Sequence, residues 1–234
     1  MRDKFEEQLE HLKVDLIKMG ALCEVAISVT IESMIKYQDI DATSNSGKTI
    51  KLLNSTKEAY QKVSTTKDEI DHMERSIENQ CLKILLQQQP VASDLRMVSA
   101  TMKMIYDLQR IGEQANDIAE ISRYINNGVE NATMLQNISL KQMAEAVVKM
   151  VTNSVDAFVH SKLDLAKEVI AYDDVVDELF SKVKSKLGDI IRQDGDSSKC
   201  LDYLMIAKYL ERIGDHAVNI AEWVVFMKTG THSN

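Results

Sequence analysis

A thirteen-residue segment occurs twice in this chain, and this internal repeat limits the folds that the chain can adopt. Residues 108–120 read LQRIGEQANDIAE and residues 210–222 read LERIGDHAVNIAE, which agree at 8 of 13 positions. Unrelated segments of average composition would agree at roughly one position. The chain therefore contains two copies of one structural unit.

The composition favours helices in both copies. The 234 residues include one proline, Pro90, and 8 glycines, and 5% of them are aromatic. Proline and glycine interrupt helices, whereas aromatic and β-branched residues supply most strand cores. We therefore predict an all-α protein, built as two tandem antiparallel three-helix bundles that are related by the internal repeat.

Apolar residues at helical spacing predict three helices in each unit, with the repeated segment in the third. The first unit is expected over residues 1–128 and the second over residues 135–230. The predicted helices cover residues 5–37, 49–87, 91–126, 139–161, 164–193 and 199–228. Residues 41–57 have no counterpart in the second unit, and the sequence leaves open whether this insertion forms a loop or extends the second helix.

Charge and cysteine use narrow the class of function. The formal net charge is -8, which argues against nonspecific nucleic-acid binding because such binding needs a basic surface. No run of 18 apolar residues occurs, so we expect no membrane insertion. The three cysteines, Cys23, Cys81 and Cys200, are odd in number and widely spaced, which is typical of reduced, buried thiols in a cytoplasmic protein.

Acidic residues of the second unit predict a metal site. A helix advances about 100° per residue, so Glu211 and Asp215 lie on one face, opposite the apolar stripe of the last helix. Asp173 and Asp177 have the same spacing in the preceding helix. Two residues that lie at the same level of a helical hairpin have numbers whose average falls at the turn. The average is 194, in the turn DGDSS, both for Asp173 with Asp215 and for Asp177 with Glu211. Four carboxylates would thus meet at one level.

Facing carboxylates repel one another, and a divalent cation would cancel this repulsion. All-oxygen ligation suits Mg, Mn or Fe(II), with Zn also possible. The alternative is a solvated acidic surface paired with Lys208 and Arg212. His216 lies about 140° from Glu211 and is expected to face away from the acids. Gly214, inside the same helix, indicates a closely approaching neighbour.

The equivalent positions of the first unit form a poorer metal site. The residue numbers average to 90, the position of the proline in the turn, both for Lys67 with Glu113 and for Asp71 with Gln109. A cation and an amide replace two acids, so we expect this unit to bind metal weakly or not at all. The alternative is a rearranged site built from the acids of this unit: Asp71, Asp107 and Glu113, with Asp68 and Glu120 nearby.

Together these motifs resemble the PhoU family. LQRIGE and LERIGD occur with QQQPVASDLR at residues 87–96 and the opening MRDKFEEQLEHL, a combination that covers nearly the whole chain. The resemblance implies a cytoplasmic negative regulator of the phosphate-starvation response and of phosphate uptake. It implies two partners, the ATPase subunit of the phosphate ABC transporter and a phosphate-sensing histidine kinase, with a homodimer as the expected assembly.

The resemblance also implies a cofactor, because some PhoU-like proteins bind multinuclear metal clusters through E(D)-x-x-x-D motifs. By position these motifs fall on Asp173 with Asp177 and on Glu211 with Asp215, which implies a divalent or transition metal such as Fe, Zn, Mn or Mg. In the first unit a lysine and a glutamine interrupt the motif.

Three classes of function remain open at this point. A non-catalytic, metal-binding adaptor is the leading hypothesis, because the chain has no phosphate-binding loop and no spacing that suggests a Ser, His and Asp triad. A carboxylate-bridged di-metal enzyme would need two Glu-x-x-His motifs, and only Glu69 with His72 has that spacing. A helical scaffold protein without metal would share the fold and the partners.

Overall fold

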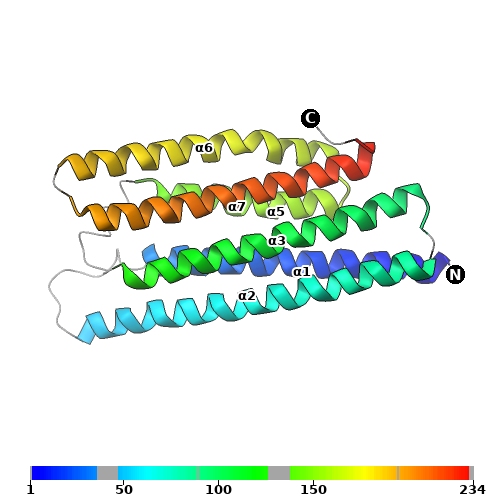
Figure 1. Ribbon diagram of the computed structural model, residues 1–234, viewed down its shortest axis with the longest axis horizontal. Helices are drawn as coiled ribbons and strands as arrows, with labels where there is room; N and C mark the ends of the chain where they lie inside the picture. The colour runs from blue at the N-terminus through cyan, green and yellow to red at the C-terminus, as the bar shows by residue number, and fades with distance from the viewer. Residues whose placement is uncertain (1, 36–46, 89, 126–137, 194, 232–234) are drawn as a thin grey trace.

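The structure, a computed structural model, describes residues 2–35, 47–88, 90–125, 138–193 and 195–231. These residues form six α-helices and no strand: α1 (Arg2–Ile35), α2 (Gly47–Gln88), α3 (Ala92–Tyr124), α5 (Leu140–Val159), α6 (Leu163–Arg192) and α7 (Ser197–Thr229). All six run along the long axis of the molecule (Figure 1). The all-α prediction is confirmed, and every predicted helix begins and ends within three residues of the observed one.

The insertion is helical over most of its length. Residues 47–57 belong to α2 and extend it to 42 residues, so the helical alternative is correct for this part. Residues 41–46 of the insertion lie outside the described residues.

The helices form two antiparallel triplets, α1–α2–α3 and α5–α6–α7, as the repeat predicts. The triplets meet where α3 packs along α7 and α1 packs along α5, while α2 and α6 lie on opposite outer sides (Figure 1). Buried residues of all six helices form one continuous apolar core. A division between two units, at residues 128 and 135, therefore stays a prediction, because the two triplets share that core.

The repeated segments face each other at the centre of the molecule. In two antiparallel helices, the numbers of residues that face each other have a constant sum. Asp107 contacts His216 and Arg96 contacts Met227, and both pairs of numbers add to 323. At this register Arg110–Ile111 lies opposite Arg212–Ile213, because 110 with 213 and 111 with 212 also add to 323. Both isoleucines are fully buried. Each RIG segment thus packs against its own counterpart, which explains why the chain contains this helix twice.

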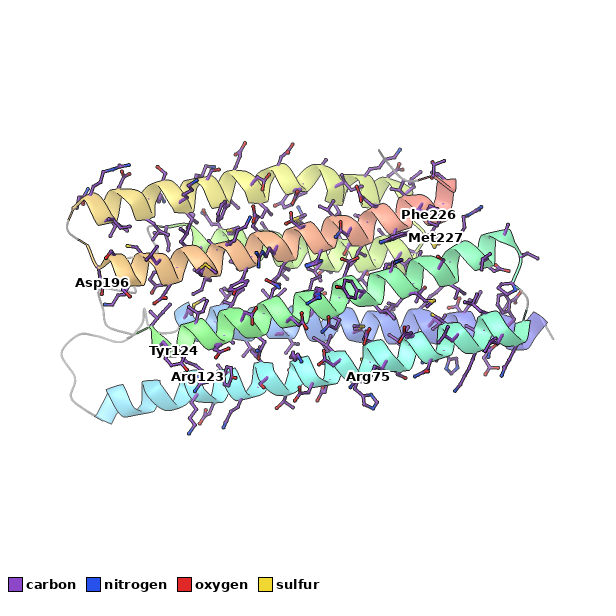
Figure 2. All side chains as sticks on the ribbon, viewed as in Figure 1. Arg75, Arg123, Tyr124, Asp196, Phe226 and Met227 are labelled. Atoms are coloured by element: carbon purple, nitrogen blue, oxygen red, sulfur yellow. The ribbon has the colours of Figure 1, made fainter. Side chains whose placement is uncertain are left out.

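Arg96 joins the two triplets at one end of this helix pair. Its guanidinium Nε donates to the carbonyl oxygen of Met227 at 3.3 Å. The carbonyl end of a helix carries partial negative charge, so the arginine stabilises the end of α7. Figure 2 shows Met227 beside the first turns of α3, and Tyr124, at the other end of α3, on the same side of the molecule as Asp196 at the start of α7. The two helices are therefore antiparallel.

Two further expectations concern exposure and membranes. The three cysteines are buried and free, as predicted, and burial raises the pKa of Cys81 to about 12. A thiol with so high a pKa is protonated and unreactive at neutral pH. None of the described helices combines the length and the apolar character that crossing a membrane requires.

Candidate functional site

The α6–α7 hairpin brings the four predicted carboxylates of the second unit into one electrostatic group. Gly214 lies against α6: a Cβ atom placed there would be 3.5 Å from both Asp173 Oδ1 and Val176 Cγ1. A neighbouring helix thus contacts this glycine, but at ordinary van der Waals distance, so the close approach that the glycine predicted is not observed. Since 173 and 214 average close to 194, the contact also agrees with the register that places Asp173 opposite Asp215.

Burial and mutual repulsion make this group electrostatically unfavourable. Partial burial, together with the charges of Asp177 and Asp215, raises the pKa of Asp173 to about 6. The pKa of Asp215 is also raised, first by burial and then by the charge of Glu211. Asp173 and Asp215 therefore both sense charges on the two helices, and at neutral pH the group would be stabilised by an additional cation.

Lys208 supplies only part of the compensating charge. Among the described residues it is the one cation that forms an ion pair with any of the four carboxylates, and its partner is Glu211. This pair agrees with the solvated-surface alternative for one acid. Asp177 is exposed and lies at a surface hollow on α6 that Glu178 and Lys182 also line. This acid is thus accessible to ions from solvent.

The side chains of this site are not arranged as a preformed coordination sphere. Within the described part of the chain, no three His, Cys, Asp or Glu side chains lie close enough together to hold a metal ion. The chemistry of the four carboxylates suits a hard cation. The pKa of Asp173 is raised first by burial and then by repulsion from neighbouring acids, and a bound cation would offset both. The donor set fits a metal, and binding would require the carboxylates to rotate toward it.

The first unit places its equivalent residues in a closed network of hydrogen bonds and ion pairs. Gln109 Nε2 donates to Asp71 Oδ1 at 3.1 Å, which confirms the predicted pairing of these two residues across the hairpin. The same amide donates to Glu113 Oε1 at 2.8 Å. Lys67 pairs with Asp71 Oδ2 and Arg110 with Glu113 Oε2, both at 2.5 Å. Protein donors thus reach all four carboxylate oxygens.

Asp107, the third acid of the rearranged first-unit site, lies on a different side of α3. It is 6% exposed and accepts hydrogen bonds from two residues of α7, from Asn219 Nδ2 at 3.2 Å and from His216 Nδ1 at 2.9 Å when that nitrogen is protonated. His216 therefore turns toward α3, as expected from its angle. The structure does not bring Asp107 to the Asp71–Glu113 network.

This contact between α3 and α7 is not among the contacts predicted from the sequence, although the sequence contains a signal for it. Asp107 lies three residues after Met104 and four before Ile111, both fully buried, so it occupies the apolar stripe of its helix. A carboxylate at such a position needs a buried partner. The pattern predicts that a partner exists, but it does not identify His216.

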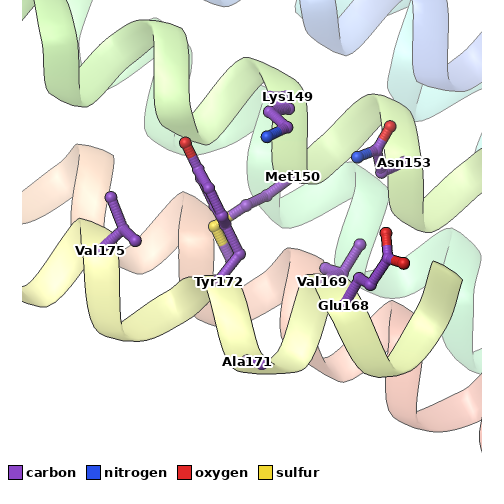
Figure 3. Close-up of a pocket in the computed structure, with 8 residues that line it drawn as sticks. All are labelled: Lys149, Met150, Asn153, Glu168, Val169, Ala171, Tyr172 and Val175. Atoms are coloured by element: carbon purple, nitrogen blue, oxygen red, sulfur yellow. The ribbon is translucent and has the colours of Figure 1, made fainter. Parts of the chain in front are cut away.

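A separate pocket of about 300 Å³ opens between α5 and α6 (Figure 3). It is lined by Lys149, Met150, Asn153, Glu168, Val169, Ala171, Tyr172 and Val175. The ammonium group of Lys149 lies 4.2 Å from the centre of the Tyr172 ring, a favourable cation–π contact. None of the four carboxylates lines this pocket, so it is distinct from the candidate site.

The fold and the site define a duplicated, all-helical bundle protein with a carboxylate group on its second repeat. Residues 42–122 and 140–224 each match the family model of the PhoU domain. The chain therefore belongs to the PhoU family.

Full-length relatives and solved structures support this assignment. The chain is 34% identical to a PhoU homologue of Clostridium acetobutylicum, over 98% of this chain and 96% of the relative. It is 33% identical to a PhoU homologue of Pseudomonas aeruginosa, over 97% of this chain and 86% of the relative. Both relatives are phosphate-specific transport system accessory proteins by name.

Crystal structures of PhoU have the same fold. The protein from Pseudomonas aeruginosa superposes with a TM-score of 0.78 at 30% identity, over 97% of this chain and 100% of that one. The PhoU of Streptococcus pneumoniae, which is named a phosphate transport system regulatory protein, superposes with a TM-score of 0.79 over 98% of this chain and 99% of that one. At 21% identity this second match shows the fold alone.

Proposed function

We propose that this chain is a cytoplasmic accessory protein of phosphate transport that represses phosphate uptake and the phosphate-starvation response. One observation carries the proposal: the chain is 34% identical, over almost its full length, to a phosphate-specific transport system accessory protein. The matched region includes both RIG segments and the PVASDLR turn, so the relationship extends to both repeats.

The proposed mode of action is contact rather than catalysis. Long helices give the molecule an extended surface that suits docking against other proteins. We propose the ATPase subunit of the phosphate ABC transporter and a phosphate-sensing histidine kinase as partners, and a homodimer as the assembly. The Glu-x-x-His spacing on α2 does not favour a di-metal enzyme, because Glu69 and His72 are both exposed.

The proposal includes a divalent cation on the α6–α7 hairpin, held by Asp173, Asp177, Glu211 and Asp215. When bound, the ion would neutralise charge that the structure leaves largely uncompensated. It would thereby hold the two helices together at this level. The second candidate is a metal-free helical scaffold, which is favoured by the lack of a preformed three-ligand cluster among the described residues.

Deletion of the gene tests the regulatory role. A reporter driven by a phosphate-starvation promoter should become active in phosphate-replete medium when the chain is absent, and the wild-type chain should silence it again. The variant Asp173→Asn plus Glu211→Gln should restore silencing less well. The matched control, Asp189→Asn plus Glu145→Gln, changes two exposed acids of the same types and should behave as wild type. A reporter that stays silent after deletion would refute the regulatory role.

A further inference from the structure

The first unit carries a different set of charges at the positions equivalent to the proposed cation site of the second unit. The four equivalent positions hold four acids in the second unit, but Lys67, Asp71, Gln109 and Glu113 in the first. With Arg110, the first-unit group contains two formal positive and two formal negative charges, so it is neutral. The second-unit group, even with Lys208, retains an excess of negative charge.

Hydrogen bonds in the first unit connect α2 to α3 without an added ion. Asp71 of α2 pairs with Lys67 through one oxygen and accepts from Gln109 of α3 through the other. The Gln109 amide also donates to Glu113, whose second oxygen pairs with Arg110. Each carboxylate oxygen already has a protein donor, and the charges of Lys67 and Arg110 beside these oxygens would repel a metal ion.

Ion pairs balance the charge in one hairpin and not in the other. In the first unit, Lys67 pairs with Asp71 and Arg110 pairs with Glu113. In the second unit, Lys208 pairs with Glu211, and no other cation among the described residues forms an ion pair with the remaining three acids. Charge is therefore satisfied in the first hairpin and largely unsatisfied in the second.

We infer that the Lys67 ammonium and the Gln109 amide replace a metal ion in the first unit, so that each chain contains one cation-independent and one cation-dependent hairpin. This inference rests on the proposed cation site of the second unit. It assigns one cation site per chain, on α6–α7, although the repeat provides two equivalent positions. Divalent cations would consequently stabilise the α6–α7 hairpin and leave the α2–α3 hairpin unchanged.

A gain-of-function variant tests the inference with MnCl₂ as the only ligand. The starting protein is Asp173→Asn plus Glu211→Gln, which removes two acids of the second site. Adding Lys67→Asp and Gln109→Glu gives the first unit four carboxylates at the same positions. Isothermal titration should show no Mn²⁺ binding by the starting protein and about one ion per chain for the converted one. At Mn²⁺ 100-fold above Kd, its Tm should rise by about 5 °C or more.

Two controls separate the possible failures. The control Gln61→Glu plus Lys62→Asp makes the same exchanges at exposed positions of α2, and it should gain no Mn²⁺ binding. If circular dichroism shows that the converted protein does not fold, Lys67→Gln in the same background replaces it. This variant removes the ammonium alone, and Mn²⁺ should then raise its Tm.

Three results would overturn the inference. The first is that the converted protein folds but does not bind Mn²⁺. The second is that Mn²⁺ leaves the Tm of the Lys67→Gln protein unchanged. The third is Mn²⁺ binding by the wild-type chain that Asp71→Asn plus Glu113→Gln abolishes. If the wild-type chain binds no Mn²⁺ but the converted protein does, the proposed second-unit site fails and the role of Lys67 stands.

Discussion

Asp173 carries the clearest sign of unsatisfied charge in the molecule. Its pKa of about 6 lies above the ordinary value of 3.8, first because it is partly buried and then because Asp177 and Asp215 are close. The protonated form is therefore favoured in the folded chain relative to the unfolded chain. The stability that this preference contributes is fully present below pH 3.8 and is lost as the pH rises through 6.

Neutralising Asp173 should stabilise the metal-free protein at neutral pH. We expect Asp173→Asn to raise the free energy of unfolding at pH 7 by about 1 kcal/mol, since solvent screening reduces the full effect of the pKa shift. At about pH 3 the variant and the wild type should be equally stable, because Asp173 is then protonated in both the folded and the unfolded chain. Urea unfolding with a chelator present measures both. A variant that is less stable than wild type at pH 7 would contradict the account.

The two glycines of the repeated motif differ in the space around them. A Cβ atom at Gly112 would lie 2.9 Å from Ile70 Cδ1, a distance that requires the isoleucine to move. At Gly214 the nearest atoms would be 3.5 Å away, which is ordinary van der Waals contact. Helix propensity alone favours alanine over glycine by about 1 kcal/mol at both positions.

Alanine should therefore stabilise the protein at Gly214 and not at Gly112. We expect Gly214→Ala to raise the free energy of unfolding by up to about 1 kcal/mol, and Gly112→Ala to give no gain. Ile70→Val removes the methyl group that is in the way, so Gly112→Ala should be more favourable in that background than in the wild type. Equal effects of Gly112→Ala in both backgrounds, measured by urea unfolding, would contradict the packing argument.

At the scale of helices, the register within each hairpin could be predicted from the sequence, whereas the contact between the triplets could not. In a hairpin with a short turn, the position of the turn alone determines which residues of the two helices face each other. Averaging residue numbers around the turn correctly paired Asp71 with Gln109. The register of α3 against α7 depends on how two triplets that are distant in sequence dock together. Asp107 was consequently assigned to the wrong neighbours, since it contacts His216 and Asn219.

The Asp107 contact should contribute measurably to the docking of α3 on α7. Asp107→Ala leaves His216 and Asn219 without their acceptor in a buried contact and should cost about 2 kcal/mol. In a double-mutant cycle with His216→Ala, the two substitutions should couple by more than about 0.5 kcal/mol. Asp68→Ala, at an exposed position of α2, is the control and should change stability little. Strictly additive effects of Asp107→Ala and His216→Ala would contradict the contact.

For the whole molecule, duplication has kept the packing of the two halves and changed their charge. Ile111 and Ile213 are both fully buried where the RIG segments meet. The charged groups beside them differ: α2–α3 is neutralised by Lys67 and Arg110, and α6–α7 is not. Comparison of the two halves in sequence predicted this difference, because Lys67 and Gln109 stand where the second half has acids. The closed network of the first unit could not be predicted, because it depends on the side-chain rotamers of four residues.

Anomalous diffraction from crystals soaked in MnCl₂ tests the central claim most directly, because it locates each bound ion. The account predicts one strong peak per chain between α6 and α7, coordinated by oxygens of Asp173, Asp177, Glu211 and Asp215. It predicts no peak beside Asp71 and Glu113, where Lys67 and Gln109 already occupy the carboxylate oxygens. A peak in the α2–α3 hairpin, or an empty α6–α7 hairpin at saturating Mn²⁺, would contradict it.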